Sequence, residues 1–231
     1  MADLPDPISR SERQRQTREA LVFAARAVFA EVGYHAASLD QIARHAGFSK
    51  GAVYSNFEGK AALFLAVMDA NFELAYTEAW DPFQRVEDVV SAEVAGRWSP
   101  EEVADAMTGF ALATLEFVAA AARDDALAEE LAKRMDQLLD AYTDIAEKSR
   151  AADETIPVEQ MGALLAALDQ GAGVLLLGGG RGVDQRLLRM GIRRLLDPAR
   201  AKEPVDDEDG WPGLHDQVVQ QRIAASLGED H

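Results

Sequence analysis

Apolar residues recur every three or four positions along most of the chain, which is the spacing of one face of an α-helix. No run of alternating apolar and polar residues bounded by hairpin turns interrupts this pattern, so it predicts no sheet. The stripes begin at Leu21, Leu63, Val103, Leu127 and Val158, with a shorter one at Leu188. The chain is therefore predicted to be all-α.

Residues that begin or end helices lie between these stripes. Gly33 follows the first stripe and predicts a helix end. Residues 99–102 (SPEE) predict a helix start, because serine caps a helix, proline fits its first turn, and acids favour its N-terminus. Residues 178–182 (GGGRG) predict a break between two later helices.

Two short helices joined by a glycine turn are predicted where the chain reads SLDQIARHAGFSKG. Ser38 can cap the first helix, and Gln41 stands at the capping-box position. Gly47 supplies the turn, Ser49 caps the second helix, and Phe48 is expected to fill the core. Such a pair is a helix-turn-helix, whose second helix enters the major groove of DNA.

The polar residues of this motif suit contact with DNA. Lys50 can meet a base edge or a phosphate, and Gly51 leaves room for a phosphate to approach. The predicted DNA-binding residues are Ser38, Gln41, Ser49, Lys50, Gly51, Tyr54, Ser55, Asn56 and Lys60. A basic arm that reaches phosphates or a minor groove is predicted from Arg10, Arg13, Arg15 and Arg18.

Many spaced positions in this part of the chain agree with one known pattern at once. They are Gly33-Tyr34, Ser38-Leu39, Ile42-Ala43, Ala46-Gly47, Ser49-Lys50-Gly51, Tyr54-Ser55-Asn56-Phe57, Lys60 and Leu63. In these positions the chain resembles the TetR family of transcriptional regulators, except that Asn56 stands where Tyr or His is common.

The resemblance implies a helical N-terminal DNA-binding domain and a larger helical C-terminal domain. It also implies a homodimer that binds a pseudo-palindromic operator in double-stranded DNA, usually as a repressor. A small molecule bound in the C-terminal domain is expected to move the two reading heads apart and release the DNA.

Charge supports a division of the chain into unlike parts. Residues 8–60 carry eight Lys or Arg against five Asp or Glu, a net charge of +3, whereas the whole chain has −17. A basic module on an acidic body fits a DNA-binding domain, and chance plus a solubilising surface is the alternative. We predict a helix-turn-helix domain at 8–60, a helical ligand-binding and dimerisation domain at 61–198, and an acidic linker with a short helix at 199–231.

The C-terminal body offers candidates for dimerisation and for ligand binding. Small and apolar residues that would let helices pair across a two-fold axis are Gly162, Ala163, Ala166, Gly173, Leu188, Ile192 and Leu195. A site for a small, mainly apolar ligand is predicted from Trp98, Phe110, Glu116, Phe117, Met135, Tyr142, Met161 and Gln170. For both sets the alternative is ordinary packing within the chain or exposure to solvent.

The sequence argues against several other classes of protein. It has no cysteine, its four histidines lack metal-ligand spacing, and GGGRG lacks the P-loop and dinucleotide-binding patterns. The start has no apolar signal core, and the apolar stretch 161–177 contains Asp169 and is short for a membrane span. We predict a cytoplasmic regulator without cofactor, metal, membrane partner or enzymatic activity. The alternative is a helical enzyme or ligand carrier in which the helix-turn-helix is only structural.

Overall fold

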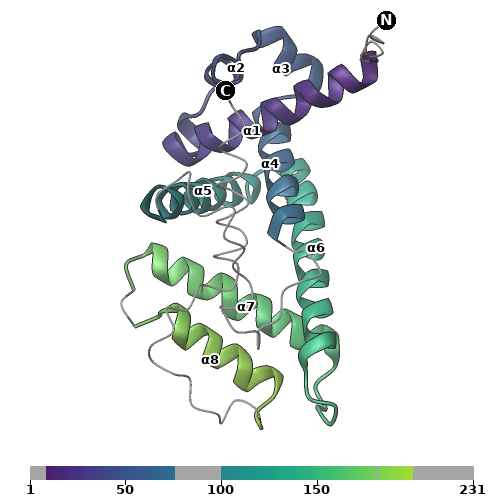
Figure 1. The fold of residues 1–231 in the computed structure, drawn as a ribbon, viewed down its shortest axis with the longest axis vertical. Helices are drawn as coiled ribbons and strands as arrows, with labels where there is room; N and C mark the ends of the chain where they lie inside the picture. Colours follow the sequence, from purple (N-terminus) through teal and green to yellow (C-terminus); the bar gives the residue numbers. More distant parts are fainter. Residues whose placement is uncertain (1–8, 76–99, 181, 200–231) are drawn as a thin grey trace, which may run out of the picture. The chain divides into compact units, whose positions relative to one another are not determined.

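The computed structural model describes residues 9–75, 100–180 and 182–199. Trp98 and the predicted C-terminal helix lie outside these residues. Within them the chain is helical, as predicted, and forms no strand (Figure 1). The helices are α1 (Arg10–Ala36), α2 (Leu39–His45), α3 (Lys50–Asn56), α4 (Lys60–Ala75), α5 (Pro100–Ala121), α6 (Asp125–Ser149), α7 (Val158–Leu177) and α8 (Gln185–Leu196).

Contacts between residues divide the chain into two units. Unit 1 holds Met1–Ala70 and Asp105–Ala122, and unit 2 holds Asn71–Ala104 and Arg123–His231. The predicted boundary between residues 60 and 61 falls at the first residue of α4, whereas the contacts add the first part of α4 and most of α5 to the N-terminal unit. The two helices of the predicted helix-turn-helix thus belong to the same unit as most of α5, which lies much further along the chain.

An aromatic cluster holds unit 1 together, formed by Phe29, Tyr34, Phe64, Phe110 and Phe117. Phe64 is fully buried and stacks on Phe117 with 4.7 Å between ring centroids, and on Phe110 with 5.5 Å. Tyr34 packs edge-on against Phe64 at 5.2 Å and Phe117 at 5.1 Å. Because these rings come from α1, α4 and α5, the cluster packs α5 against α1 and α4.

The backbone of α1 breaks at Gly33, where the sequence predicts a helix end. Gly33 has φ +80°, which a residue with a side chain rarely adopts. The break turns Tyr34 into the core, where it is 7% exposed. Gly33 therefore marks the point at which α1 gives way to the turn that leads into α2.

The backbones of α1 and α5 lie in close contact at Gly109. A Cβ atom added at Gly109 would lie 2.0 Å from the carbonyl oxygen of Ala30. Ala113, one turn further along α5, is fully buried. Glycine at 109 is thus what lets α5 lie this close to α1.

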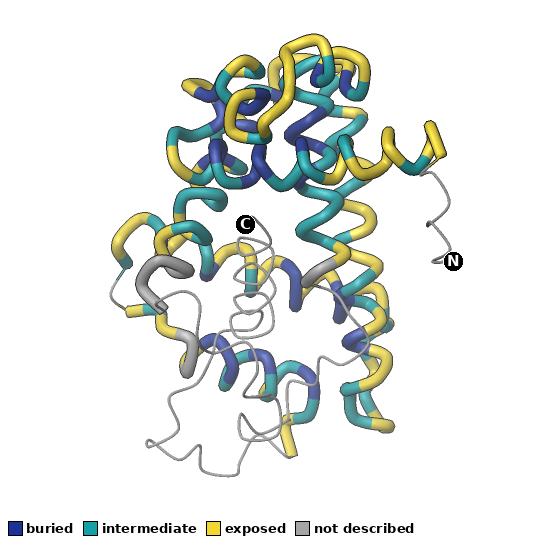
Figure 2. The backbone as a smooth tube through the Cα atoms, turned by 45° about the horizontal axis from the view of Figure 1, so that its top comes forward, coloured by how far each residue is buried: buried dark blue, intermediate teal, exposed yellow. Residues whose placement is uncertain are grey.

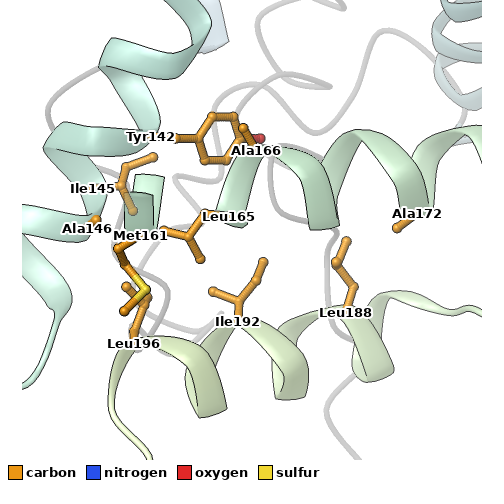
Figure 3. Packing of buried hydrophobic residues seen from close by; sticks show 10 residues of the cluster. All are labelled: Tyr142, Ile145, Ala146, Met161, Leu165, Ala166, Ala172, Leu188, Ile192 and Leu196. Carbon is orange, nitrogen blue, oxygen red and sulfur yellow. The ribbon is translucent and has the colours of Figure 1, made fainter. Parts of the chain in front are cut away.

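Unit 2 has its own core between α6, α7 and α8. Figure 3 shows side chains of the three helices pointing toward one another. The cluster consists of Tyr142, Ile145, Ala146, Met161, Leu165, Ala166, Ala172, Leu188, Ile192 and Leu196. A Cβ added at Gly162 would lie 2.7 Å from the backbone nitrogen of Thr143, so α7 also approaches α6 closely.

Most of the predicted dimer residues are therefore used inside the chain. Ala166, Leu188 and Ile192 belong to the core of unit 2, and Gly162 packs on α6. Leu195 packs against the same core from its edge. Ala163 is exposed, and an added Cβ at Gly173 would meet nothing within 4 Å. Small and apolar residues serve packing within a chain as well as packing between chains, so the predicted dimer interface stays a prediction.

Another face of α7 carries apolar side chains that are exposed. Figure 2 colours the backbone by burial, with buried residues in dark blue and exposed residues in yellow. Leu164, Leu168 and Leu175 are 48%, 38% and 55% exposed, and their spacing of four and seven places them on one side of the helix. Within the described residues, α7 alone is long and apolar enough to cross a membrane by length and composition. We call Leu164, Leu168, Gly171 and Leu175 the α7 stripe.

Candidate nucleic-acid interface

Serine caps start both helices of the helix-turn-helix, as predicted. The Ser38 hydroxyl accepts a hydrogen bond from the backbone N–H of Gln41 at 3.2 Å, which starts α2. The Ser49 hydroxyl accepts one from the backbone N–H of Ala52 at 3.3 Å, which starts α3. Each cap satisfies an N–H group that a helix leaves unpaired at its start.

The turn between α2 and α3 uses a left-handed glycine. Gly47 has φ +71°, and the next residue, Phe48, donates its backbone N–H to the carbonyl of Ala43 at 2.9 Å. The expectation that Phe48 fills the core is wrong, because its side chain is 37% exposed. Ile42 and Val53, both fully buried, anchor α2 and α3 instead.

One face of α3 is exposed and polar while the other is buried. Lys50, Gly51, Tyr54 and Ser55 are all exposed and recur with helical spacing, whereas Val53 is fully buried. Tyr54 is 55% exposed, and the space around Gly51 is open apart from the Ser49 hydroxyl at 3.7 Å from an added Cβ. This face can present a cation, a phenol and a hydroxyl to a partner surface.

Lys50 is held by an acid from the neighbouring helix. Its Nζ lies 2.9 Å from Oδ1 and 3.0 Å from Oδ2 of Asp40, and it stands 5.9 Å from the centre of the Tyr54 ring. The hydrogen bond from Lys50 to Asp40 raises the pKa of the lysine, so the ammonium stays charged. Asp40 is a residue that the sequence prediction missed.

The end of α3 is secured by groups that were predicted to face DNA. Asn56 is half-buried and donates from Nδ2 to the carbonyl of Ala52 at 2.8 Å. Arg18 donates to the carbonyl of Asn56 at 2.9 Å, and its guanidinium lies 4.2 Å from the centre of the Phe57 ring. A cation at the C-terminus of a helix also interacts favourably with the negative end of the helix dipole. Arg18 and Asn56 thus position α3.

Lys60 likewise stabilises unit 1, which we call the head. Its Nζ donates to the carbonyls of Tyr34 at 2.8 Å, His35 at 3.0 Å and Ala37 at 3.0 Å, which uses all three N–H groups of the ammonium. Burial lowers the pKa of Lys60, and the negative charge of Glu116 acts against this lowering. Lys60 therefore clamps the turn between α1 and α2 in this structure, and a clamp on the DNA backbone stays a prediction.

Glu116 meets the same turn from α5. Its Oε2 accepts a hydrogen bond from the backbone N–H of His35 at 2.9 Å. Its Oε1 lies 2.7 Å from the position of an added Cβ at Gly33. Glu116, predicted as a polar group of a ligand site, is thus bound to the α1–α2 turn in this structure.

The other predicted ligand residues fall in both units. In unit 1, Phe110 and Phe117 belong to the aromatic cluster. In unit 2, Tyr142 and Met161 are fully buried core residues, and the Tyr142 hydroxyl donates to the carboxylate of Asp169. Met135 and Gln170 are exposed there. The ligand site itself stays a prediction.

The predicted basic arm divides into two kinds of residue. Arg15 forms ion pairs with Glu12 at 2.5 Å and Glu19 at 2.6 Å, and Arg18 secures α3. Arg10 and Arg13 are exposed in the first turn of α1, where they can reach a phosphate. Two of the four arginines therefore suit the predicted role.

Asp40 and Gly109 are two residues that the sequence analysis does not single out, although the sequence carries a signal for each. Asp40 stands in the first turn of α2, on the helix that precedes Lys50. Gly109 lies in the interior of a helical segment, MTGFALA. Glycine in a helix interior lowers stability by about 1 kcal/mol relative to alanine. Glycine at an unfavourable helix position is a signal of a close backbone contact.

Known proteins are similar to this chain in the sequence of its N-terminal part and in the fold. A sequence model described as "Bacterial regulatory proteins, tetR family" matches residues 21–67. The activator FasR of Mycolicibacterium smegmatis is 42% identical over 66 residues, 29% of this chain and 28% of FasR. The regulator TtgW of Pseudomonas putida is 38% identical over 90 residues, 38% of this chain and 67% of TtgW.

The match to FasR thus spans little more than a quarter of that protein. Among solved structures, Salmonella enterica GusR has the same fold with a TM-score of 0.54 and 24% identity, over 78% of this chain and 95% of GusR. The capped helices, the glycine turn and the exposed polar face of α3 lie inside the segment shared with these regulators. From the sequence of its head, the chain belongs to the TetR family of bacterial regulatory proteins.

Proposed function

We propose that the chain is a cytoplasmic transcriptional regulator that binds a pseudo-palindromic operator and releases it when a small molecule binds. The observation that carries this proposal is the exposed face of α3, on which Lys50, Tyr54 and Ser55 point outward while Val53 anchors the helix. A short helix with this division suits insertion into the major groove. Arg10 and Arg13 then add phosphate contacts.

The α7 stripe supports a two-fold dimer. Three exposed leucines on one side of a helix leave apolar surface in water, and a second copy would cover it. An added Cβ on Gly191 of α8 would lie 3.3 Å from Leu168, so α8 borders the stripe, and Leu187 is exposed at 43% on α8. We propose that α7 and α8 pair with the same helices of a second copy.

Replacing Leu175 by Glu is expected to convert the dimer to a monomer. Leu175 is 55% exposed, so the change leaves the core of unit 2 intact but places a charge in the proposed interface. Light scattering at micromolar concentration measures the mass. Leu112→Glu, on α5 and 45% exposed, is the matched control and should remain dimeric. A wild-type chain that is monomeric under these conditions would contradict the dimer.

The release of DNA requires a path from the ligand-binding body to the head, and α5 offers one. This helix contacts the α1–α2 turn through Glu116 and the aromatic cluster through Phe117, and α6 of unit 2 begins four residues after it ends. We propose that a ligand favours a conformation in which these α5 contacts hold the head in an orientation that does not fit the operator. The ligand can shift this equilibrium only by its difference in affinity for the two states.

Selection of bound fragments from the sheared genome of the source organism tests the function. The wild-type chain is expected to recover one or a few pseudo-palindromic sites. Tyr54→Ala should lower affinity for these sites about tenfold or more, because it removes an exposed contact of α3 without touching the core. Fluorescence anisotropy with labelled duplexes gives the affinities, and Leu139→Ala on α6, 39% exposed, is the control that should bind normally.

Recovery of random fragments by the wild type and by Tyr54→Ala alike would contradict the proposal. Turnover of a bound small molecule would then favour a helical enzyme or carrier. A reporter gene placed behind the recovered site decides the sign of regulation. We expect repression, and an increase in expression would instead place the chain with activators such as FasR.

A further inference from the structure

The ion pair between Asp40 and Lys50 lies where α2 meets α3. Its two side chains are 53% and 56% exposed, with 2.9 Å between Nζ and Oδ1. Exposed ion pairs of this kind add little to the stability of a fold. Either side chain can therefore exchange its partner for a group on DNA without unfolding unit 1.

The carboxylate of Asp40 would weaken DNA binding if Lys50 served only to bind phosphate. Lys50 is the first residue of α3 and the only charged residue in its sequence, KGAVYSN. A carboxylate beside it cancels its charge and repels phosphates, which weakens the sequence-independent part of DNA binding. The placement of Asp40 is better explained if the carboxylate has a partner of its own on the bases.

A G·C base pair offers partners for both members on one edge. In the major groove, guanine presents two adjacent acceptors, N7 and O6, and its cytosine presents the N4 amino group as a donor. An ammonium can donate to the guanine while a carboxylate accepts from the cytosine. In an A·T pair the amino group stands between two acceptors, N7 and O4, which disfavours a carboxylate there.

We propose that Asp40 and Lys50 act together to read one G·C base pair in each half of the operator, which makes Asp40 a specificity-determining residue. The inference rests on the proposed function, since it names how the same α3 surface selects its site. Tyr54 is exposed beside the pair, with its ring centre 5.9 Å from the Lys50 ammonium. The ion pair holds the ammonium and the carboxylate side by side in the free protein.

The test compares Asp40→Ala with the wild-type chain by fluorescence anisotropy. The probes are the selected operator, the same duplex with one G·C pair per half-site replaced by A·T, and a random duplex. For the wild type, the replacement at the position read by the pair should weaken binding about tenfold. For Asp40→Ala this discrimination should fall at least threefold, while affinity for the random duplex rises because Lys50 is released.

These opposite changes separate base reading from a structural role, which would lower both affinities together. Glu31→Ala is the matched control, because it removes an exposed acid of unit 1 from α1. It should leave the discrimination unchanged. The double variant Asp40→Lys/Lys50→Asp keeps an ion pair with its members exchanged, and selection with it should favour C·G at the position where the wild type favours G·C.

Three results would overturn the inference while leaving the proposed function in place. They are an A·T pair at every strongly selected position, the same discrimination in Asp40→Ala as in the wild type, or an equal loss of affinity for selected and random duplexes. Failure of the wild type to select any site would instead overturn the proposed function and this inference together.

Discussion

Gly109→Ala should lower the free energy of unfolding by about 1–3 kcal/mol, although alanine favours a helix more than glycine does. The added methyl group would lie 2.0 Å from the Ala30 carbonyl oxygen and 2.9 Å from its carbon. Both are backbone atoms, so no side chain can rotate away to make room. The helices α1 and α5 would have to separate, which also opens the aromatic cluster beside them.

Urea unfolding followed by circular dichroism measures this loss. Gly173→Ala in α7 is the matched control, because an added Cβ there meets nothing within 4 Å. That variant should gain about 0.5–1 kcal/mol, the usual preference of an unstrained helix for alanine. Equal stabilisation of both variants would show that α1 and α5 do not touch at Gly109.

Lys60→Met should also be strongly destabilising, by about 2 kcal/mol. It leaves three carbonyl groups of the α1–α2 turn without their charged donor, and hydrogen bonds to charged groups contribute more than neutral ones. The partial exposure of the site lets water replace some of this loss. Operator affinity should fall as well, because the turn sets where α2 and α3 begin.

Urea unfolding distinguishes this clamp on the turn from a clamp on DNA. Lys133→Met, which removes an exposed lysine paired with Glu130 at 2.6 Å, should cost less than about 1 kcal/mol. If Lys60 instead bound a phosphate, Lys60→Met would unfold like the wild type. It would then lower the slope of log affinity against log salt by about 0.9.

Local features of the fold could be predicted because they depend on neighbours in the sequence. The serine caps of α2 and α3, the glycine turn at Gly47 and the helix break at Gly33 all lie where the sequence predicts them. Each is determined by the backbone preferences of one or two residues. The periodicity of the apolar residues likewise predicts every described helix of the C-terminal body.

The partners of these helices could not be predicted in the same way. An apolar stripe shows that Phe110 and Phe117 are buried, but not that they pack on the reading head rather than on a ligand. The same holds for Gly162, whose small size fits a neighbour in the same chain as well as in a second copy. Periodicity identifies the buried face and leaves its partner open.

Residue type predicts the candidate site, but it does not predict the contacts that some of these side chains make within the chain. Exposed lysines and arginines on a DNA-binding motif all suggest phosphate contacts, yet Lys60 and Arg18 bind backbone carbonyls within the head. Their distance from those carbonyls in sequence, 23 to 38 residues, hides the contacts from any local reading. Asp40 could not be predicted in this way because an acid is not expected on a surface that is proposed to face DNA.

Because α5 completes the core of unit 1, the reading head is not a continuous piece of chain. A fragment that ended after α4 would carry Phe64 without Phe110 and Phe117, and would expose an aromatic surface to water. A chimera that transplants this head onto the body of another regulator therefore has to bring residues 105–122 along with residues 1–70. The junction for such engineering lies at two places in the sequence rather than one.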